Sequence, residues 1–290
     1  MSALLSPTAQ RTIVQRTRGR GHGPIVRLMS PGDLGQVLKP FVFLDLFEGD
    51  ASFAGSMPIH PHSGLATVTV VTEGDLRFDD PASGEGELGY GGVEWMRAGG
   101  GVWHGKEMSA GTSARVAGFQ LWLALPPALE NGPVDSQYIE ARAMQQSGPV
   151  TVIVGDHAGA VSPVRAPAGI NYLLVTLQPG QAWTYEPPEG HEAAWLAVSH
   201  GRLVGANAVS AGEMAVFGPT GSIALQASPD RSAVFVLGSA KPHPHDLVTG
   251  MYSVHTSRQA LAQGEAGIQA LAQRMQARPA AQGRTAVFSG

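Results

Sequence analysis

Two histidines that flank a single proline stand directly before the most strand-like run of the chain. His60 and His62 lie in segment 57–65, and the valine- and threonine-rich run 66–72 follows them. β-Branched residues favour strands, and Pro61 keeps the residue before it out of the helical region. Because side chains alternate along an extended chain, both imidazoles are expected on the same side of it. They would form half of a metal site, although a bare His-x-His is more often a pair of unrelated histidines.

Abundant glycine and proline narrow the fold class further. The 290 residues include 38 glycines and 21 prolines without a repeating period. This composition argues against long helices and favours many short strands joined by tight turns. The chain is long enough for two domains, each with its own core. We therefore expect an all-β fold of two β-barrels in tandem. Strands of the second half are expected at 150–154, 172–177, 194–198, 213–217 and 233–237.

A proline-rich segment marks the change from the first domain to the second. Residues 126–133 cannot form the interior of a strand, because proline lacks the N–H that a strand ladder needs. The boundary is therefore expected within residues 126–148, which gives a first domain over 11–135 and a second over 136–290. Residues 1–10 are expected to form a disordered leader.

Local patterns predict further elements. Block 40–47 reads as a buried strand in which Asp45 needs a hydrogen-bond partner. Residues 73–75 are expected to turn strand 66–72 into a hairpin. Near the C-terminus, Ser257 is expected to cap a short helix. The apolar residues that recur at helical spacing in that helix are Ile268, Leu271 and Met275.

Charge and cysteine content exclude several classes of function. Lysine and arginine total 19 against 23 aspartates and glutamates, for a net charge of −4. No general positive field is therefore available for nucleic acid or an anionic membrane. Cysteine is absent, which leaves histidine and carboxylate as the metal ligands. The sequence has neither a stretch of transmembrane length nor the pattern of a secretory signal. We expect a soluble cytoplasmic protein that binds neither nucleic acid nor membranes.

A third histidine follows a glycine-rich run. His104 comes after residues 98–101, whose glycines permit a sharp turn back towards His60 and His62. Glu107 follows three residues later. Three histidines and one carboxylate inside a small barrel would bind a divalent transition ion and leave positions open for water, substrate or dioxygen. Such open positions are typical of an active site rather than of a closed structural site.

These motifs together resemble those of the pirin family, whose members contain two cupin domains. The resemblance covers nearly the whole chain, more strongly in its first half. The segments that carry it are 40–45, 60–64, 92–96, 98–104, 118–126 and 250–256. It implies two tandem cupin (jelly-roll type) antiparallel β-barrels with short C-terminal helices. It also implies one metal in the N-terminal barrel and none in the C-terminal barrel.

Carried over residue by residue, the resemblance implies the metal ligands His60, His62, His104 and Glu107. The implied cofactor is one divalent metal, iron(II) in the physiological state, exchangeable with manganese, cobalt, nickel or zinc. Pirins commonly place the glutamate two residues after the histidine, whereas here the spacing is three, so a regular strand would turn Glu107 away. A bulge at 105–106 would restore it. Otherwise the fourth position is left to water, or Glu107 faces solvent beside Lys106.

The resemblance implies two classes of function. As an enzyme, the chain would be of quercetin 2,3-dioxygenase type, acting with dioxygen on a flavonol or catechol-like aromatic diol, with Glu107 as the catalytic proton acceptor. As a binding module, it would be a non-catalytic, metal-dependent regulatory protein that binds a protein partner in a redox-dependent way. Because pirins are typically monomeric, we expect a monomer.

Rival sites have weaker patterns. His243 and His245 repeat the His-Pro-His text, and segment 189–192 offers further ligand types. Neither is followed by a glycine turn that ends in histidine. A Ser/His/Asp hydrolase lacks support because the sequence contains no Gly-x-Ser-x-Gly motif.

Overall fold

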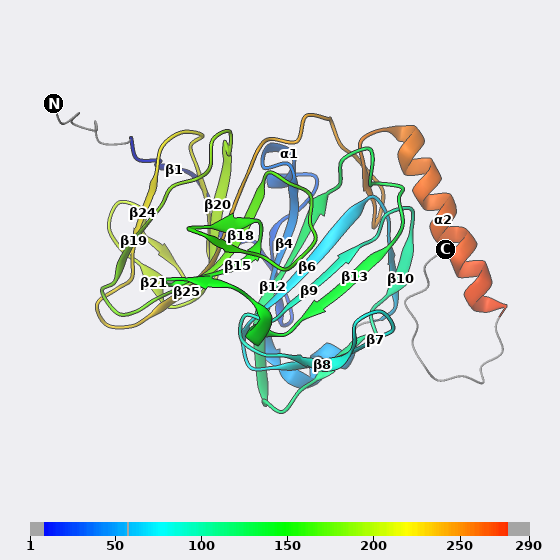
Figure 1. Cartoon of the computed structure of the whole chain (residues 1–290), viewed down its shortest axis with the longest axis horizontal. Helices are drawn as coiled ribbons and strands as arrows, with labels where there is room; N and C mark the ends of the chain where they lie inside the picture. The colour runs from blue at the N-terminus through cyan, green and yellow to red at the C-terminus, as the bar shows by residue number, and fades with distance from the viewer. Residues whose placement is uncertain (1–8, 57, 278–290) are drawn as a thin grey trace. The chain divides into compact units, whose positions relative to one another are not determined.

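The computed structural model describes residues 9–56 and 58–277, and strands form most of its regular structure (Figure 1). The all-β fold class is thereby confirmed. Residues 1–8 of the predicted leader lie outside the described residues, as do Met57 and residues 278–290. Within the described ranges, no helix combines the length and the apolar composition needed to cross a membrane.

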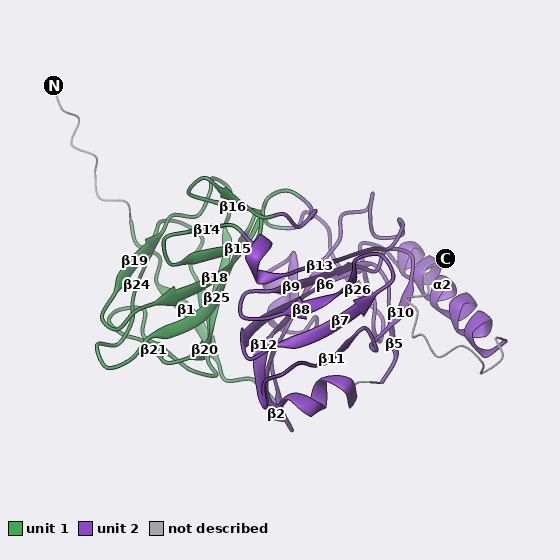
Figure 2. Ribbon diagram, turned by 60° about the horizontal axis from the view of Figure 1, so that its bottom comes forward, with its two compact units in different colours: residues 1–20, 145–162, 168–242 green, residues 21–144, 163–167, 243–290 purple. Residues whose placement is uncertain are grey.

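The chain divides into two compact units, each assembled from segments that are distant in sequence (Figure 2). Unit 1 contains residues 1–20, 145–162 and 168–242, and unit 2 contains residues 21–144, 163–167 and 243–290. The predicted contiguous ranges 11–135 and 136–290 differ from these units at both ends. The first strand pairs within unit 1, and the C-terminal segment packs within unit 2.

Unit 2 is organised around a seven-stranded sheet with β12 at its centre. In spatial order the strands are β13 (Asp135–Ile139), β9 (Val93–Arg97), β6 (Leu65–Glu73), β12 (Arg115–Ala124), β4 (Phe41–Asp50), β3 (Ile25–Met29) and β2 (Arg20–His22). The register places Gln120 of β12 between Asp45 and Thr69. Asp45 has the partner that its burial requires, because Nε and Nη2 of Arg27 donate to its carboxylate at 2.6 and 3.0 Å.

Smaller sheets complete unit 2. They pair β10 (Val102–His104) with β5 (His60–His62), and β7 (Leu76–Asp80) with β8 (Gly84–Leu88) and β11 (Met108–Ala110). The hairpin predicted at 73–75 is wrong, because β7 pairs with β8 and β11 and not with β6. Gly74, with φ of +72°, turns the chain out of one sheet and into the other. The remaining elements before the last helix are α1 (Leu34–Val37), η1 (Ala51–Ser56), η2 (Ala141–Ala143), β26 (Val248–Thr249) and β27 (Val254–His255).

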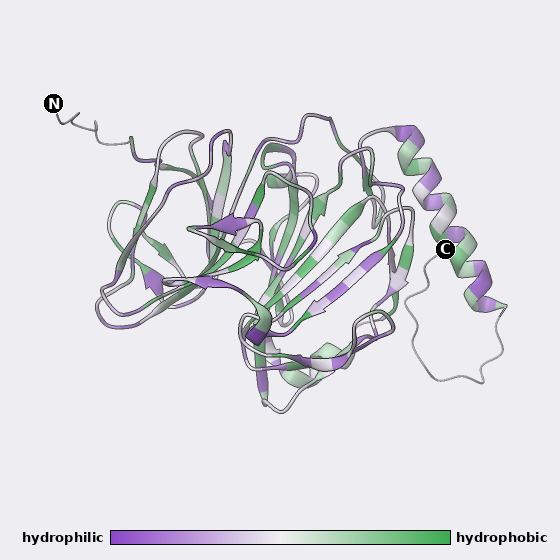
Figure 3. Ribbon diagram, viewed as in Figure 1, coloured by the Kyte–Doolittle hydropathy of each residue, from purple (hydrophilic) through white to green (hydrophobic). Residues whose placement is uncertain are grey.

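Unit 1 contains a second seven-stranded sheet. Its order is β1 (Ile13–Thr17), β23 (Met214–Phe217), β20 (Ala193–His200), β25 (Ala233–Ala240), β18 (Ile170–Leu177), β15 (Val150–Val154) and β14 (Gln146–Ser147). The shorter pairs are β16 (Asp156–His157) with β17 (Ala160–Val161), β19 (Ala182–Tyr185) with β24 (Ile223–Gln226), and β21 (Arg202–Leu203) with β22 (Val209–Ser210). The five strands predicted for the second half of the chain are all present here. Apolar residues concentrate on them (Figure 3), and they enclose a core that includes Leu173, Leu196 and Phe235.

The C-terminal segment ends in one helix, α2 (Arg258–Gln276), which belongs to unit 2. Ser257 caps it as predicted, because its hydroxyl accepts a hydrogen bond from the backbone N–H of Ala260. Leu271 of the predicted apolar stripe is buried. At 19 residues the helix is longer than the short helices expected from the sequence.

Replacing a core residue of the central strand should lower the stability of the fold. Leu121 of β12 has no exposed surface. We predict that Leu121→Ala lowers the free energy of unfolding by about 2–5 kcal/mol, because lost apolar contacts and the remaining cavity both destabilise the core. Urea denaturation followed by circular dichroism measures this change. Val37→Ala, at a side chain that is 69% exposed, is the control and should change it by less than about 0.5 kcal/mol. Equal effects would contradict a core position for Leu121.

Candidate metal centre

The pairing of two short strands brings three histidines together in unit 2. Strand β5 runs antiparallel to β10, and the register places His104 directly opposite His60. His62, two residues further along β5, faces the same side. The ring centroid of His60 lies 4.9 Å from that of His62 and 4.6 Å from that of His104. Each ring offers one nitrogen, and these nitrogens lie within 4.8 Å of one another, close enough to share one ion.

A glycine turn returns the chain so that β10 can pair with β5. Gly99 has φ of +51° and Gly101 has φ of +140°, a region that favours glycine. A Cβ atom at Gly99 would lie 2.1 Å from the carbonyl oxygen of Gly132. The turn predicted from the glycine-rich run is therefore confirmed, and it brings His104 to the first two histidines.

Backbone carbonyls orient two of the rings. Nδ1 of His62 donates to the carbonyl oxygen of Tyr252 at 3.0 Å, and Nδ1 of His60 donates to that of Pro58 at 2.9 Å. These bonds leave the Nε2 lone pair of each ring available as a ligand. Nε2 of His62 and Nε2 of His104 are buried without a hydrogen-bond partner among the described residues. Because buried polar atoms are nearly always satisfied, this donor set fits a divalent cation.

Burial keeps the imidazoles of His62 and His104 neutral, which metal binding requires. His62 is 1% exposed, and burial, followed by the nearby His60, lowers the pKa of His62 to about 3. Burial and the other two histidines hold the pKa of His104 well below its usual value. Trp122 packs against His62 with ring centroids 4.8 Å apart, and stacks on Phe43 at 4.0 Å. One side of the site is therefore dry and aromatic.

Glu107 lies beside His104. Its Oε2 is 4.0 Å from Nδ1 of His104 and accepts hydrogen bonds from the backbone N–H groups of Gly105 and Lys106 at 2.7 and 3.0 Å. Gly105, with φ of +128°, supplies irregular backbone at this point. The residue is 4% exposed, so the alternative in which it faces solvent is wrong. A ligand role for Glu107 stays a prediction, because the group of nitrogens within 4.8 Å does not include its carboxylate.

A second carboxylate, not predicted from the sequence, is buried in the same unit. Glu94 of β9 is 2% exposed. Its Oε1 accepts a hydrogen bond from the hydroxyl of Thr67 at 3.2 Å, whereas Oε2 has no partner among the described residues. Burial raises the pKa of Glu94 to about 7. An acidic residue inside the otherwise apolar run 93–96 is the signal that could have identified it.

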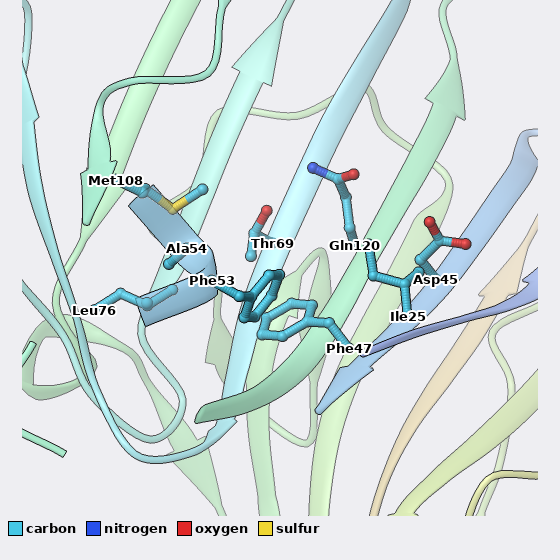
Figure 4. Close-up of a pocket in the computed structure, with 9 residues that line it drawn as sticks. All are labelled: Ile25, Asp45, Phe47, Phe53, Ala54, Thr69, Leu76, Met108 and Gln120. Carbon is cyan, nitrogen blue, oxygen red and sulfur yellow. The ribbon is translucent and has the colours of Figure 1, made fainter. Parts of the chain in front are cut away.

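A cavity of about 100 Å³ lies in unit 2, which also contains the three histidines (Figure 4). Asp45, Thr69 and Gln120 face it from three neighbouring strands. Gln120 and Trp122 are two residues apart on β12 and therefore share a face, so the cavity is one layer of side chains away from the aromatic wall of the site. The rest of its lining is apolar: Ile25, Phe47, Phe53, Ala54, Leu76 and Met108.

The other candidate histidines form no comparable group within residues 9–56 and 58–277. The rings of His243 and His245 lie 5.6 Å apart, but no third ligand joins them. In unit 1, Nδ1 of His191 lies 2.8 Å from the hydroxyl of Ser239. Nδ1 of His191 therefore has a hydrogen-bond partner, whereas the Nε2 atoms of His62 and His104 have none among the described residues.

In the metal-free protein, the free energy of unfolding should decrease as the pH falls below about 6.5. In the unfolded chain His62 titrates near that ordinary value, whereas in the folded protein its pKa is about 3. The unfolded state therefore binds the proton first, which lowers stability by up to about 1.4 kcal/mol per pH unit for this group. Urea denaturation across this pH range measures the slope. His62→Gln should reduce it and His22→Gln, at an exposed histidine, should not. An unchanged slope in His62→Gln would contradict a buried neutral ring.

Comparison with known proteins places these features in a wider group. A family model described as Pirin matches residues 24–123. A Pirin-like protein of Caulobacter vibrioides is 37% identical over 182 residues, which cover 58% of this chain and 63% of that protein, less than two thirds of its length. Pirin-1 of Arabidopsis thaliana is 30% identical over 243 residues, which cover 80% of this chain and 82% of that protein.

The solved structures agree with this grouping at the level of the fold. A crystal structure of quercetin 2,3-dioxygenase from Acinetobacter baumannii superposes with a TM-score of 0.78 at 24% identity, covering 89% of this chain and 96% of that chain. The predicted fold of two cupin domains is thereby confirmed. With Arabidopsis Pirin-1 matched over most of both lengths, the chain belongs to the pirin family.

Proposed function

We propose that the chain binds one divalent transition metal through the Nε2 atoms of His60, His62 and His104. The observation that carries the proposal is the pair of buried, unpartnered Nε2 atoms on His62 and His104. Imidazole suits iron, manganese, cobalt, nickel and zinc, and we propose iron(II) as the physiological metal, as the family resemblance implies. The carbonyl contacts at Nδ1 of His60 and His62 supply the second layer of bonds that orients such ligands.

We further propose a dioxygenase activity of the quercetin 2,3-dioxygenase type. A metal at such a site supplies Lewis-acid polarisation and redox access to dioxygen. The side chains around the metal bind the substrate and accept its proton. Trp122 offers an aromatic wall to the substrate ring, and the buried carboxylate of Glu107 accepts the proton of the substrate hydroxyl. The name of the Acinetobacter baumannii protein supports this class of reaction.

The cavity of about 100 Å³ is lined by none of the three histidines and by neither Trp122 nor Glu107, so its volume does not set the size of a substrate at the metal. We propose a flavonol or a catechol-like aromatic diol as the substrate class, because both carry an aromatic ring for Trp122 and a hydroxyl proton for Glu107.

A second candidate function, metal-dependent binding of a protein partner, has one observation in its favour. Three of the exposed large apolar side chains lie next to residues of the site: Ile59, Met251 and Tyr252, which are 37%, 86% and 39% exposed. Ile59 precedes His60, and the carbonyl of Tyr252 holds His62. Retention of a protein partner in a pull-down, without oxygen uptake, would favour this function over the enzyme.

Metal content tests the proposed site directly. Protein purified without chelator should contain about one equivalent of divalent metal per chain by elemental analysis. His60→Ala and His62→Ala should each lose it, because two histidines leave too few ligands. His22→Ala, at an exposed histidine outside the site, is the control and should retain it. Full occupancy in both site variants would overturn the assignment.

Oxygen consumption tests the proposed reaction. Iron-loaded protein should consume dioxygen with quercetin or with catechol-like diols, because the metal would bind their adjacent oxygens and give access to dioxygen. An oxygen electrode measures both rates. His104→Ala should abolish the uptake by removing a metal ligand. A parent protein that retains its iron but consumes no dioxygen with any diol would argue against the enzyme.

The role of Glu107 can be separated by substitution. If its carboxylate ligates the metal or orients His104, Glu107→Gln should weaken cobalt binding by roughly ten- to a hundredfold. Isothermal titration at neutral pH measures the affinity. X-ray absorption of the cobalt-loaded parent and variant then distinguishes the two roles, because only a ligand changes the count of coordinating oxygens. Equal cobalt affinity in Glu107→Gln and the parent would exclude both a ligand role and an orienting role for Glu107.

A further inference from the structure

The C-terminal segment passes directly behind the strand that carries His60 and His62. The carbonyl of Tyr252 accepts the Nδ1–H of His62 at 3.0 Å. One residue after His62, the hydroxyl of Ser63 lies 2.9 Å from Oγ of Ser253 and 3.0 Å from Nε2 of His255. All of these contacts lie within unit 2. The orientation of His62 therefore depends on a segment that is 190 residues away in sequence.

A buried glutamate anchors that segment. Oε2 of Glu130 lies 3.3 Å from Nδ1 of His255. The same carboxylate accepts hydrogen bonds from the backbone N–H and the hydroxyl of Thr256, both at 2.7 Å. Glu130 is 4% exposed, His255 1% and Ser63 not at all. Glu130, His255 and Ser63 thus form a buried chain of close polar contacts that ends beside His62. Its Glu130–His255 link is a charge contact without hydrogen-bond geometry, because Nδ1 of His255 has no hydrogen-bond partner among the described residues.

The surrounding backbone rules out a hydrolytic role for this chain of groups. Its order of carboxylate, imidazole and hydroxyl matches a hydrolase triad. However, a Cβ atom at Gly264 of α2 would lie 2.6 Å from both the Ser63 hydroxyl and Nε2 of His255. The helix backbone therefore covers the pair and leaves no space for a substrate. A fully buried chain of this kind can act only by fixing the segments that it joins.

We propose that Ser63, His255 and Glu130 are positioning residues for the metal centre. They hold segment 250–256 against β5 so that the carbonyl of Tyr252 stays on Nδ1 of His62, which directs Nε2 of that ring towards the ion. The inference rests on the proposed metal function. Supporting contacts of this type are worth roughly ten- to a hundredfold in metal affinity.

The test compares two buried serines, each with its hydroxyl against a histidine. Ser63→Ala removes the contact to His255, and Ser239→Ala removes the 2.8 Å contact to His191 in unit 1. Both serines have no exposed surface, so the two changes are closely matched. Cobalt titrated into Ser63→Ala should bind roughly ten- to a hundredfold more weakly than in the parent. Ser239→Ala should bind like the parent. Equal affinity in Ser63→Ala and the parent would overturn the proposal.

A readout without metal separates this proposal from the metal function itself. Imidazole nitrogen-15 shifts of the metal-free parent should show His62 in the single tautomer with hydrogen on Nδ1. In Ser63→Ala the other tautomer should appear, and in Ser239→Ala it should not. If the tautomer of His62 changes in Ser63→Ala but the parent binds no cobalt, the metal site is refuted and the positioning role is left intact. An unchanged His62 tautomer in Ser63→Ala refutes the positioning role.

A milder variant guards against a folding defect. Glu130→Gln keeps an oxygen for Thr256 and removes the charge beside His255. It should weaken cobalt binding in the same direction as Ser63→Ala, by a smaller factor, with an unfolding transition close to that of the parent. Parent-like cobalt affinity in Glu130→Gln as well as in Ser63→Ala would exclude the whole chain of groups as positioning residues.

Discussion

The antiparallel pairing of β5 with β10 is the contact on which the candidate site depends. It sets His104 opposite His60, and the two-residue period of an extended strand adds His62 on the same side. Pro61 and Trp103, paired between them, face the other way. A slip of one residue in this register would exchange the two faces and disperse the histidines. The glycine turn before β10 is therefore as necessary to the site as the ligands are, because it determines where the third histidine arrives.

The site is assembled at a cost in stability. Buried polar atoms without partners destabilise a fold by roughly 1–3 kcal/mol each. Three of those in the described residues belong to the site or to its aromatic wall: Nε2 of His62, Nε2 of His104 and Nε1 of Trp122. A packed core without a ligand would not retain them. Their concentration is typical of functional sites, where local rules of packing are broken in favour of binding.

Those parts of the molecule that depend on neighbours in sequence were predictable. The histidine pair, the strand that follows it, the cap at Ser257 and the need of Asp45 for a partner all follow from local pattern. The direction of the Glu107 side chain does not follow from local pattern, because it depends on the φ of Gly105. The strands that pair with β7 could not be predicted either. Sheet packing determines its pairing with β8 and β11, and the turn at Gly74 does not. Glu94 was missed because its burial is set by neighbouring strands.

The ligands and the groups that orient them differ in how far apart they lie in the chain. The three histidines come from two paired strands, β5 and β10, that are close in sequence. Residues 60–104 are therefore enough to predict a metal site. The carbonyl that fixes the His62 tautomer arrives from Tyr252, after the whole of unit 1 has been synthesised. A change in segment 250–256 can therefore alter metal affinity without touching any ligand motif. Two chains with the same three histidines need not bind metal equally well, and the difference lies in residues that no local motif includes.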